Sequence, residues 1–267
     1  MLALIEADRL PGQPHITPGT LDAAIRAGGH AGRNLLVPRM EVAQDAAGRI
    51  AGVVIFALPP SDDAGQILAL HCREDHGVAT ALIDAALTAL GWTRAVEALA
   101  GPPPFAPGSP AGLAVGRRSA TRAVLDAAGF STHHTWHSLH RPLGDRPGPA
   151  TYPIASVADR DDPPGWHLEL CHLDGTLVCE ATVDRAADQA AALRWITTHP
   201  DHRRRGLGRH LLEQCLDVAA EHHAREMTAW IRETDADSEE DDGAAIRLLT
   251  ALDFRPGEML HSFHRRP

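Results

Sequence analysis

The sequence contains no lysine, because all 25 of its basic residues are arginine. Against 35 acidic residues they leave a formal net charge of −10. Proteins that bind nucleic acids need positive charge to neutralise the phosphates, so this balance argues against a nucleic-acid partner. The missing lysine and the low aromatic content of 4% are typical of a GC-rich genome and indicate nothing about function.

Cysteine is also scarce, and long hydrophobic runs are missing. The four cysteines form no C-x-x-C pair, so we expect reduced thiols rather than a disulfide framework. The spacing of His167, Cys171 and His172 matches no zinc pattern, so we expect no bound metal. No apolar run approaches the ~20 residues that span a bilayer. The first ten residues include Glu6, Asp8 and Arg9 where a signal peptide would be apolar. We therefore expect a cytoplasmic protein with no membrane partner.

The sequence does contain an internal repeat. Phe130 is followed seven residues later by His137, and Phe254 is followed at the same interval by His261. A glycine that opens an apolar helical stretch recurs in the same order, so the two anchors together indicate a tandem duplication. The segment 143–153 between the halves is rich in proline and glycine, which is typical of a linker.

This arrangement predicts two domains, 1–145 and 146–267, each able to bury its own core. Both halves have the same order of expected elements, and we predict an α+β fold for each, a mixed, mostly antiparallel twisted sheet flanked by helices. The elements expected in the first half are 40–44, 50–57, 66–72, 77–90, 93–99, 119–128 and 132–141. Those expected in the second half are 166–173, 176–183, 190–198, 206–220, 227–231, 244–252 and 258–264.

A basic, glycine-containing turn lies between the strand ending at Thr198 and the helix that follows it. The first turn of a helix has N–H groups without internal partners, and the helix dipole places partial positive charge there. Glycines at 206 and 208 let an anion approach the backbone, and four arginines between 203 and 209 add charge. The pattern predicts a pyrophosphate site. It is not a Walker loop, since no Gly-Lys-Ser/Thr follows, and it lacks the third glycine of a Rossmann fingerprint.

The order of a strand, Thr198-x-Pro200, Arg203-x-x-Gly206-x-Gly208, a leucine-rich helix and a final helix before Phe254 resembles the GNAT acyltransferase superfamily. The resemblance extends over 160–266 and, more faintly, 36–142. It implies an N-acetyltransferase that uses acetyl-CoA to acetylate a primary amine of a small molecule or peptide. The residues it implies for the pyrophosphate are Arg203, Arg204, Arg205, Gly206, Leu207, Gly208 and Arg209. The backbone of Ile196, Thr197 and Thr198 would bind the pantetheine arm as an added strand.

Two departures from the family pattern qualify this reading. In the first half Glu74 stands in the place of Arg203, with Asp75 beside it, and carboxylates repel a pyrophosphate. We therefore predict that the first half is degenerate and does not bind acetyl-CoA. In the second half Leu249 stands where many relatives have the tyrosine that protonates the leaving thiolate. This keeps a second interpretation open, a non-catalytic acyl-CoA-binding sensor or scaffold.

Direct acetyl transfer also needs a base for the acceptor amine. Glu180 and Glu233 are the first candidates, followed by Asp235 and His199. The segment 235–243 has six carboxylates in nine residues, which is typical of a solvated loop. Alternatively it would attract a cationic acceptor.

Overall fold

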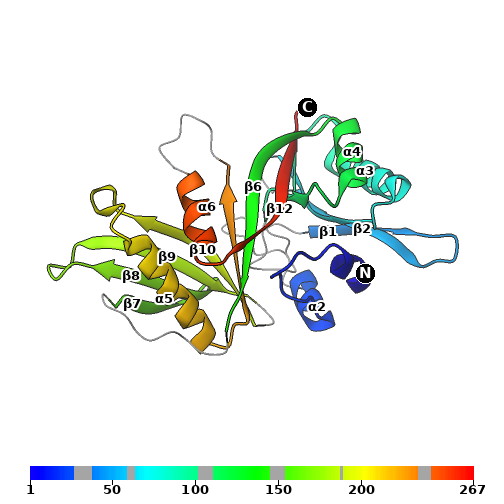
Figure 1. The fold of residues 1–267 in the computed structure, drawn as a ribbon. Helices are drawn as coiled ribbons and strands as arrows, with labels where there is room; N and C mark the ends of the chain where they lie inside the picture. Colours follow the sequence, from blue (N-terminus) through cyan, green and yellow to red (C-terminus); the bar gives the residue numbers. More distant parts are fainter. Residues whose placement is uncertain (27–37, 59–63, 102–110, 145–153, 187–188, 234–241) are drawn as a thin grey trace. The chain divides into compact units, whose positions relative to one another are not determined.

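The computed structural model describes residues 1–26, 38–58, 64–101, 111–144, 154–186, 189–233 and 242–267 (Figure 1). These residues form two compact units that are not contiguous in sequence. Unit 1 comprises residues 1–10, 15–136 and 258–267, and unit 2 comprises 11–14 and 137–257. The predicted boundary between residues 145 and 146 lies outside the described residues and stays a prediction.

Unit 1 contains a mixed sheet with the strand order β1-β2-β3-β4-β12-β6, and β5 pairs with β12. β2 pairs antiparallel with β1 and β3, β3 and β4 are parallel, and β12 is antiparallel to β4 and β5. Its strands are β1 (Pro38–Gln44), β2 (Ile50–Ala57), β3 (Gly65–His71), β4 (Val96–Ala98), β5 (Leu113–Ala114) and parts of β6 (Ser131–Pro142) and β12 (Arg255–Arg265).

Helices pack on both faces of this sheet, as the alternating directions of the β2 side chains show. Val54 and Phe56 lie in one core with residues of α3 (His76–Leu90) and α4 (Ser119–Ala127). Val53 and Ile55 point the other way, into a second cluster with residues of α1 (Leu2–Ala7) and α2 (Pro18–Arg26). Successive side chains of a strand face opposite sides, so a strand covered on both faces is apolar throughout. The sequence analysis did not predict α1, α2 or β5.

Unit 2 contains a second mixed sheet with the strand order β6-β11-β10-β9-β8-β7. The strands β7 to β10 pair antiparallel in sequence order, whereas β10 and β11 are parallel. Its elements after β6 are β7 (Ser156–Asp161), β8 (Pro164–Cys171), β9 (Leu177–Arg185), β10 (Ala190–Thr198), a 3-10 helix (Pro200–His202), α5 (Leu207–Glu221), β11 (Glu226–Arg232) and α6 (Asp242–Thr250). The hairpin, the third strand and the helices were predicted within a few residues; β7 was not.

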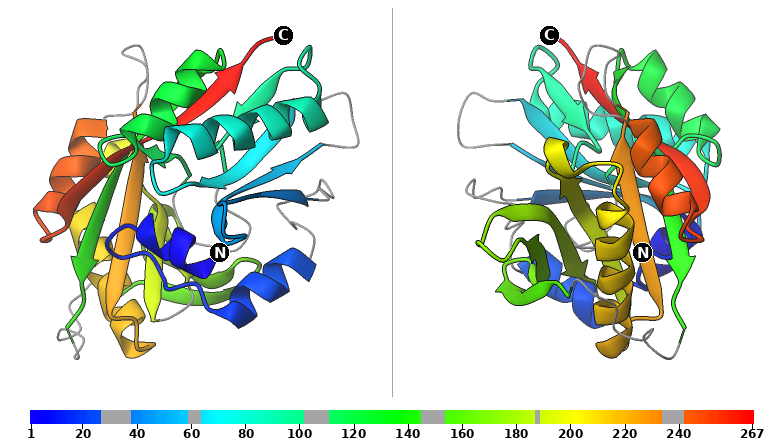
Figure 2. Two further views of the ribbon diagram at one scale, coloured as in Figure 1. Left: turned by 90° about the vertical axis from the view of Figure 1, so that its right-hand side faces the viewer. Right: turned by 60° about the vertical axis from the view of Figure 1, so that its left-hand side comes forward.

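The helix α5 covers one face of β8, β9 and β10 (Figure 2). Its apolar stripe, which includes Leu212 and Cys215, packs against Trp166, Leu168 and Ala181 of these strands. His167 and Glu169 of β8 and Glu180 and Thr182 of β9 alternate with these residues, so they point to the face opposite α5, and they are only half-buried. Polar side chains on that face can therefore contact a ligand. Part of the candidate site lies on this face.

The closing strands of the two sequence halves extend from one unit into the other. β6 belongs to unit 1 through Trp136 and to unit 2 from His137, and β12 belongs to unit 1 from Glu258. As a result Leu139 is buried in the core of unit 2, and Phe263 is buried in the core of unit 1. The expectation that each sequence half buries its own core is therefore corrected: each core includes a strand from the other half.

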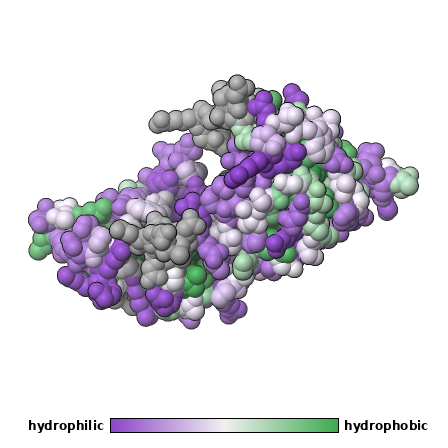
Figure 3. Space-filling model, turned by 90° about the horizontal axis from the view of Figure 1, so that it is seen from above, coloured by the Kyte–Doolittle hydropathy of each residue, from purple (hydrophilic) through white to green (hydrophobic). Residues whose placement is uncertain are grey.

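No helix in the described part of the chain is long and apolar enough to span a bilayer. All four cysteines are free, as predicted, and three of them are buried. The face shown in Figure 3 is mostly polar, with hydrophobic side chains scattered over it, which is ordinary for a protein surface.

Candidate functional site

The first feature of the candidate site is the divergence of β10 from β11. The two strands pair only from Ala190 with Glu226 to Leu193 with Ala229, although β10 continues to Thr198 and β11 to Arg232. The register against β9 shifts between Leu193 and Trp195, so a bulge occurs where the pairing with β11 stops. A bulge bends a strand and disrupts its ladder. The segment 194–198 thus has a strand edge that β11 does not cover.

The second feature is the N-terminus of α5, directly after β10. Gly206 is its N-cap residue, with φ 79° and no side-chain hydrogen bond to the helix. A Cβ on Gly206 would have no atom within 4 Å, so the space over the helix end is open. Gly208 differs, because a Cβ there would meet Thr198 Oγ1 at 3.1 Å. Gly206 therefore opens the helix end to an anion, whereas Gly208 permits close packing of the helix against the strand.

Arginines surround this helix end. Arg203 Nε donates to the carbonyl oxygen of Thr198 at 3.1 Å, which ties the loop to the end of β10. Arg209 pairs with Glu213 one turn along α5. Arg203, Arg204 and Arg205 are exposed, and within the described residues they have no carboxylate partner at ion-pair distance. The loop therefore presents uncompensated positive charge in a chain with a net charge of −10.

Three imidazoles lie beside this loop. The ring of His202 lies 4.8 Å from that of His172 and 5.7 Å from that of His199, measured between centroids. Burial lowers the pKa of His202, and the positive charges of His172, Arg205 and His199 lower it further. His199, which sequence reasoning considered as a base, is half-exposed at the N-terminus of the 3-10 helix. It follows the C-terminal end of β10 directly, next to the arginine-containing loop.

The equivalent loop of unit 1 is closed by its own carboxylates. Asp75 caps α3 by accepting a hydrogen bond from the Val78 N–H at 3.0 Å, in the position that Gly206 leaves open in α5. Glu74 accepts hydrogen bonds from the N–H groups of Ala120 and Thr121 and pairs with the buried Arg118. Asp75 thus occupies a donor of the first turn of α3, and Glu74 places a second carboxylate beside it that is held by the start of α4 and Arg118. Both carboxylates would repel an anion at this loop, as the predicted degeneracy of the first half requires.

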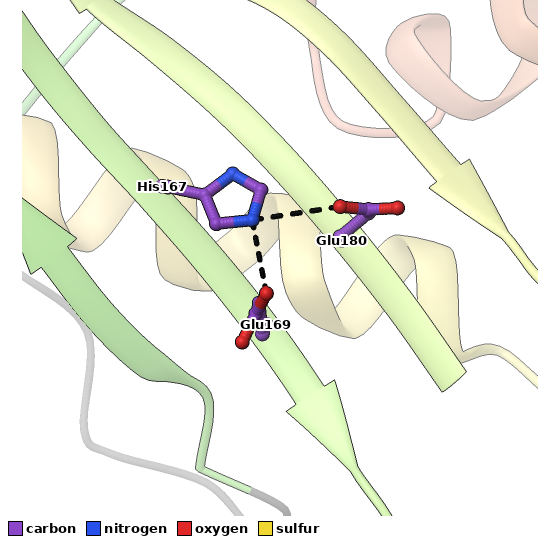
Figure 4. Close-up of side chains that lie close together, drawn as sticks. All are labelled: His167, Glu169 and Glu180. Atoms are coloured by element: carbon purple, nitrogen blue, oxygen red, sulfur yellow. Dashed lines mark hydrogen bonds and ion pairs between the residues drawn. The ribbon is translucent and has the colours of Figure 1, made fainter. Parts of the chain in front are cut away.

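Glu180 lies on the face of the unit 2 sheet opposite α5, together with two residues that sequence reasoning did not assign (Figure 4). His167 Nε2 lies 3.1 Å from Glu169 Oε1 and 3.5 Å from Glu180 Oε2. The His167 Nδ1 lies 3.2 Å from Thr182 Oγ1. Glu180 pairs in register with Thr197 of β10, so this cluster lies next to the uncovered strand segment. The signal in the sequence was the alternation His-x-Glu on a predicted strand.

The other predicted residues are not members of this cluster. Glu233 follows β11 and is exposed. Leu249 is 2% exposed in the core of unit 2, so no proton donor replaces the missing tyrosine at that position. Asp235 and most of the acidic segment 235–243 lie outside the described residues. The structure therefore brings Glu180, but not Glu233, into a group of titratable side chains.

Comparison with known proteins agrees with this geometry. Residues 132–254 match the model of the acetyltransferase (GNAT) family. A GCN5-related N-acetyltransferase from Sphaerobacter thermophilus is 12% identical with a TM-score of 0.62, covering 100% of this chain and 90% of that one. A tandem GNAT protein from the clavulanic acid biosynthesis pathway is 17% identical with a TM-score of 0.63, covering 98% and 91%. No protein of curated function matches the sequence significantly.

The family match is confined to residues 132–254, and the matched family is that of the GNAT acetyltransferases. Over its whole length the chain has the fold of these two solved GNAT proteins, one of which is a tandem protein. The α+β architecture and the tandem arrangement predicted from the repeat are thereby confirmed. At this low identity the structural relatives establish the fold alone.

Proposed function

We propose that this protein transfers an acetyl group from acetyl-CoA to a primary amine of a small molecule or peptide by direct attack of the amine on the thioester. The observation that carries the proposal is the open N-terminus of α5 beside the diverging end of β10. The helix end and the segment Arg203–Arg209 hold the pyrophosphate, and Ile196, Thr197 and Thr198 hold the pantetheine arm through their backbone. The match of residues 132–254 to the GNAT family model supports this assignment.

The chemistry requires one proton transfer before the acyl transfer. The ammonium form of the acceptor loses a proton, and the neutral nitrogen attacks the thioester carbonyl carbon. The carbon–sulfur bond of the tetrahedral intermediate then breaks to release the CoA thiolate, and the nitrogen gives its second proton to the thiolate or to water as the amide forms. Glu180 is the candidate base, since its carboxylate is half-buried and contacts the His167 imidazole, which can carry the proton away. Glu233 is the weaker candidate, because its side chain is exposed to solvent.

The charges near the site favour an acceptor that is positively charged before it reacts. Glu169 and Glu180 place two carboxylates on the face of β8 and β9 opposite α5, and the chain as a whole is acidic. Such a field concentrates ammonium ions near the thioester end of β10. We propose soluble amines with additional positive charge as the first acceptors to test.

The test measures release of free CoA from acetyl-CoA with a panel of primary amines. We expect turnover with at least one amine, and a loss of about 10²–10⁴-fold in kcat for Glu180→Gln. Glu221→Gln, at the exposed end of α5, serves as the control and should keep full activity. A Glu180→Gln enzyme with wild-type kcat, together with an inactive Glu233→Gln enzyme, would assign the base to Glu233.

The buried Leu249 supports a second candidate function, binding of acyl-CoA without catalysis. In that case the protein would act as a sensor or scaffold. The two functions differ in one observable: the non-catalytic protein binds acetyl-CoA but releases no CoA with any amine, whereas the enzyme does so steadily.

A further inference from the structure

We propose that His167, Glu169 and Glu180 form a binding site for one divalent transition-metal ion of the zinc type. The ligand atoms of the three side chains all lie within 4.8 Å of one another on β8 and β9 (Figure 4). The sequence analysis expected no metal, because it searched for cysteine and histidine spacings along the chain. This group is formed across two strands, which such spacings do not reveal.

The backbone explains why the three side chains converge. His167 and Glu169 are two residues apart on β8 and so share a face, and Glu180 of β9 is the register partner of Glu169. A tetrahedral site with metal–ligand distances of about 2.0–2.2 Å separates its ligand atoms by about 3.4 Å. The two distances from His167 Nε2, 3.1 Å to Glu169 and 3.5 Å to Glu180, lie on either side of that value.

The imidazole is also oriented for metal binding. The Nδ1 of His167 lies 3.2 Å from Thr182 Oγ1, so an Nδ1–H can donate to the hydroxyl and leave the Nε2 lone pair toward the carboxylates. Metal-binding histidines generally hold their other ring nitrogen in this way, because the hydrogen bond selects the tautomer and the ring orientation. Thr182 is thus a positioning residue for the site.

The charge of the cluster also favours a dication. Among the described residues, the His167 imidazole is the one basic side chain within ion-pair distance of Glu169 or Glu180. Two carboxylates beside a single imidazole leave at least one negative charge uncompensated. The mixed nitrogen and oxygen donors suit zinc and neighbouring metals rather than calcium. The side chains of His167, Glu169 and Glu180 are 28%, 41% and 21% exposed, which leaves room for a water ligand.

One consequence rests on the proposed function. A metal ion bound by Glu180 occupies the carboxylate that we assign as the base for the acceptor amine. We therefore expect zinc to inhibit acetyl transfer and a chelator to restore it. The binding itself does not depend on the transferase assignment, so it is measured without acetyl-CoA.

The experiment titrates ZnCl₂ by calorimetry into metal-stripped, full-length protein from which any purification tag has been removed, and records the absorption of the Co²⁺ form. We expect one saturable site per chain and a Co²⁺ spectrum typical of four- or five-coordination. His167→Ala and Glu180→Gln should each weaken zinc binding at least tenfold. His172→Ala, which removes an exposed histidine of the imidazole group beside the cofactor loop, should leave it unchanged.

Variants of Thr182 test whether the three side chains form a metal site or only lie close together by chance. Thr182→Val should weaken zinc binding about 10–100-fold, and Thr182→Ser, which keeps the hydroxyl, should restore it. Absence of a saturable site would overturn the proposal. So would a site that survives His167→Ala or is lost in His172→Ala. Zinc binding with these responses in a protein that releases no CoA would uphold the metal site and refute the proposed function.

Discussion

Single residues account for the difference between the two equivalent loops. Gly206 leaves the N-terminus of α5 open, whereas the Asp75 carboxylate accepts a hydrogen bond from the first turn of α3. Arg203 and Glu74 occupy equivalent places in the repeat, and each is tied to its own surroundings, Arg203 to the Thr198 carbonyl and Glu74 to Arg118. Because one loop has an arginine where the other has a glutamate, the two loops favour ligands of opposite charge. They also make different local hydrogen bonds.

The first prediction at this scale concerns Gly206→Ala. The added Cβ meets no protein atom within 4 Å but projects into the space over the helix end, at a φ of 79° that an L side chain rarely adopts. We expect acetyl-CoA binding to weaken at least tenfold by calorimetry. Gly48→Ala is a matched control, since Gly48 has a φ of 76° and equally open surroundings in unit 1. It should lose a similar free energy of unfolding, about 1 kcal/mol, and bind acetyl-CoA normally.

A second prediction concerns the pH dependence of Glu74. Burial raises its pKa, but hydrogen bonds from Thr121 and Arg118 outweigh this, so the folded pKa lies below the ordinary value of 4.5. A lowered folded pKa stabilises the protein above the unfolded pKa, and this contribution is lost as pH falls through the folded pKa. We expect Glu74→Gln to cost about 1–3 kcal/mol at pH 7 in chemical denaturation.

The difference in unfolding free energy between wild type and Glu74→Gln should stay constant above about pH 5.5. It should shrink as the pH falls below 4.5. A difference that is unchanged at pH 3 would show that the contribution of Glu74 comes from packing rather than charge.

Whole helices and strands were predicted well where periodicity was strong. The strand Ala190–Thr198 has its predicted bounds, and α5 begins and ends one residue later than expected. β7 was missed because every residue of Ser156–Asp161 is at least partly exposed, so no alternation of polar and apolar residues marks it. The cluster of His167 and Glu180 was missed for another reason: it depends on the register between β8 and β9, which includes a bulge that sequence alone does not place.

The capping of α3 leads to a prediction about this element. Asp75→Ala removes the acceptor for the Val78 N–H and should lower the free energy of unfolding by about 0.5–2 kcal/mol. Asp84→Ala, on the exposed side of the same helix, should stay within about 0.5 kcal/mol of wild type in the same denaturant titration. Equal losses for the two variants would show that the cap contributes nothing.

The molecule as a whole is defined by the exchange of its closing strands. Hydrophobic periodicity indicates which face of β12 is buried, but not which sheet the strand joins. This is why the repeat predicted two self-contained halves. In the structure, Phe263 belongs to the core of unit 1 with residues such as Val54 and Leu125, and β12 pairs with β4.

This exchange predicts that unit 1 depends on the C-terminal strand. Phe263→Ala should lower the free energy of unfolding by about 3–5 kcal/mol, because it leaves a cavity in that core. Met259→Ala, at an exposed position of the same strand, should cost less than about 0.5 kcal/mol. A fragment 1–145 lacks β12 and should not fold cooperatively by circular dichroism. Cooperative unfolding of that fragment would contradict the dependence.

The central claim is that the loop before α5 holds acetyl-CoA and that its counterpart in unit 1 does not. The direct test is a calorimetric titration of acetyl-CoA into wild type and into a variant with Arg203→Ala, Arg204→Ala and Gly206→Val. We predict one site per chain in wild type and no detectable binding in the variant. Two sites per chain, unchanged affinity in the variant or no binding to wild type would each contradict the claim.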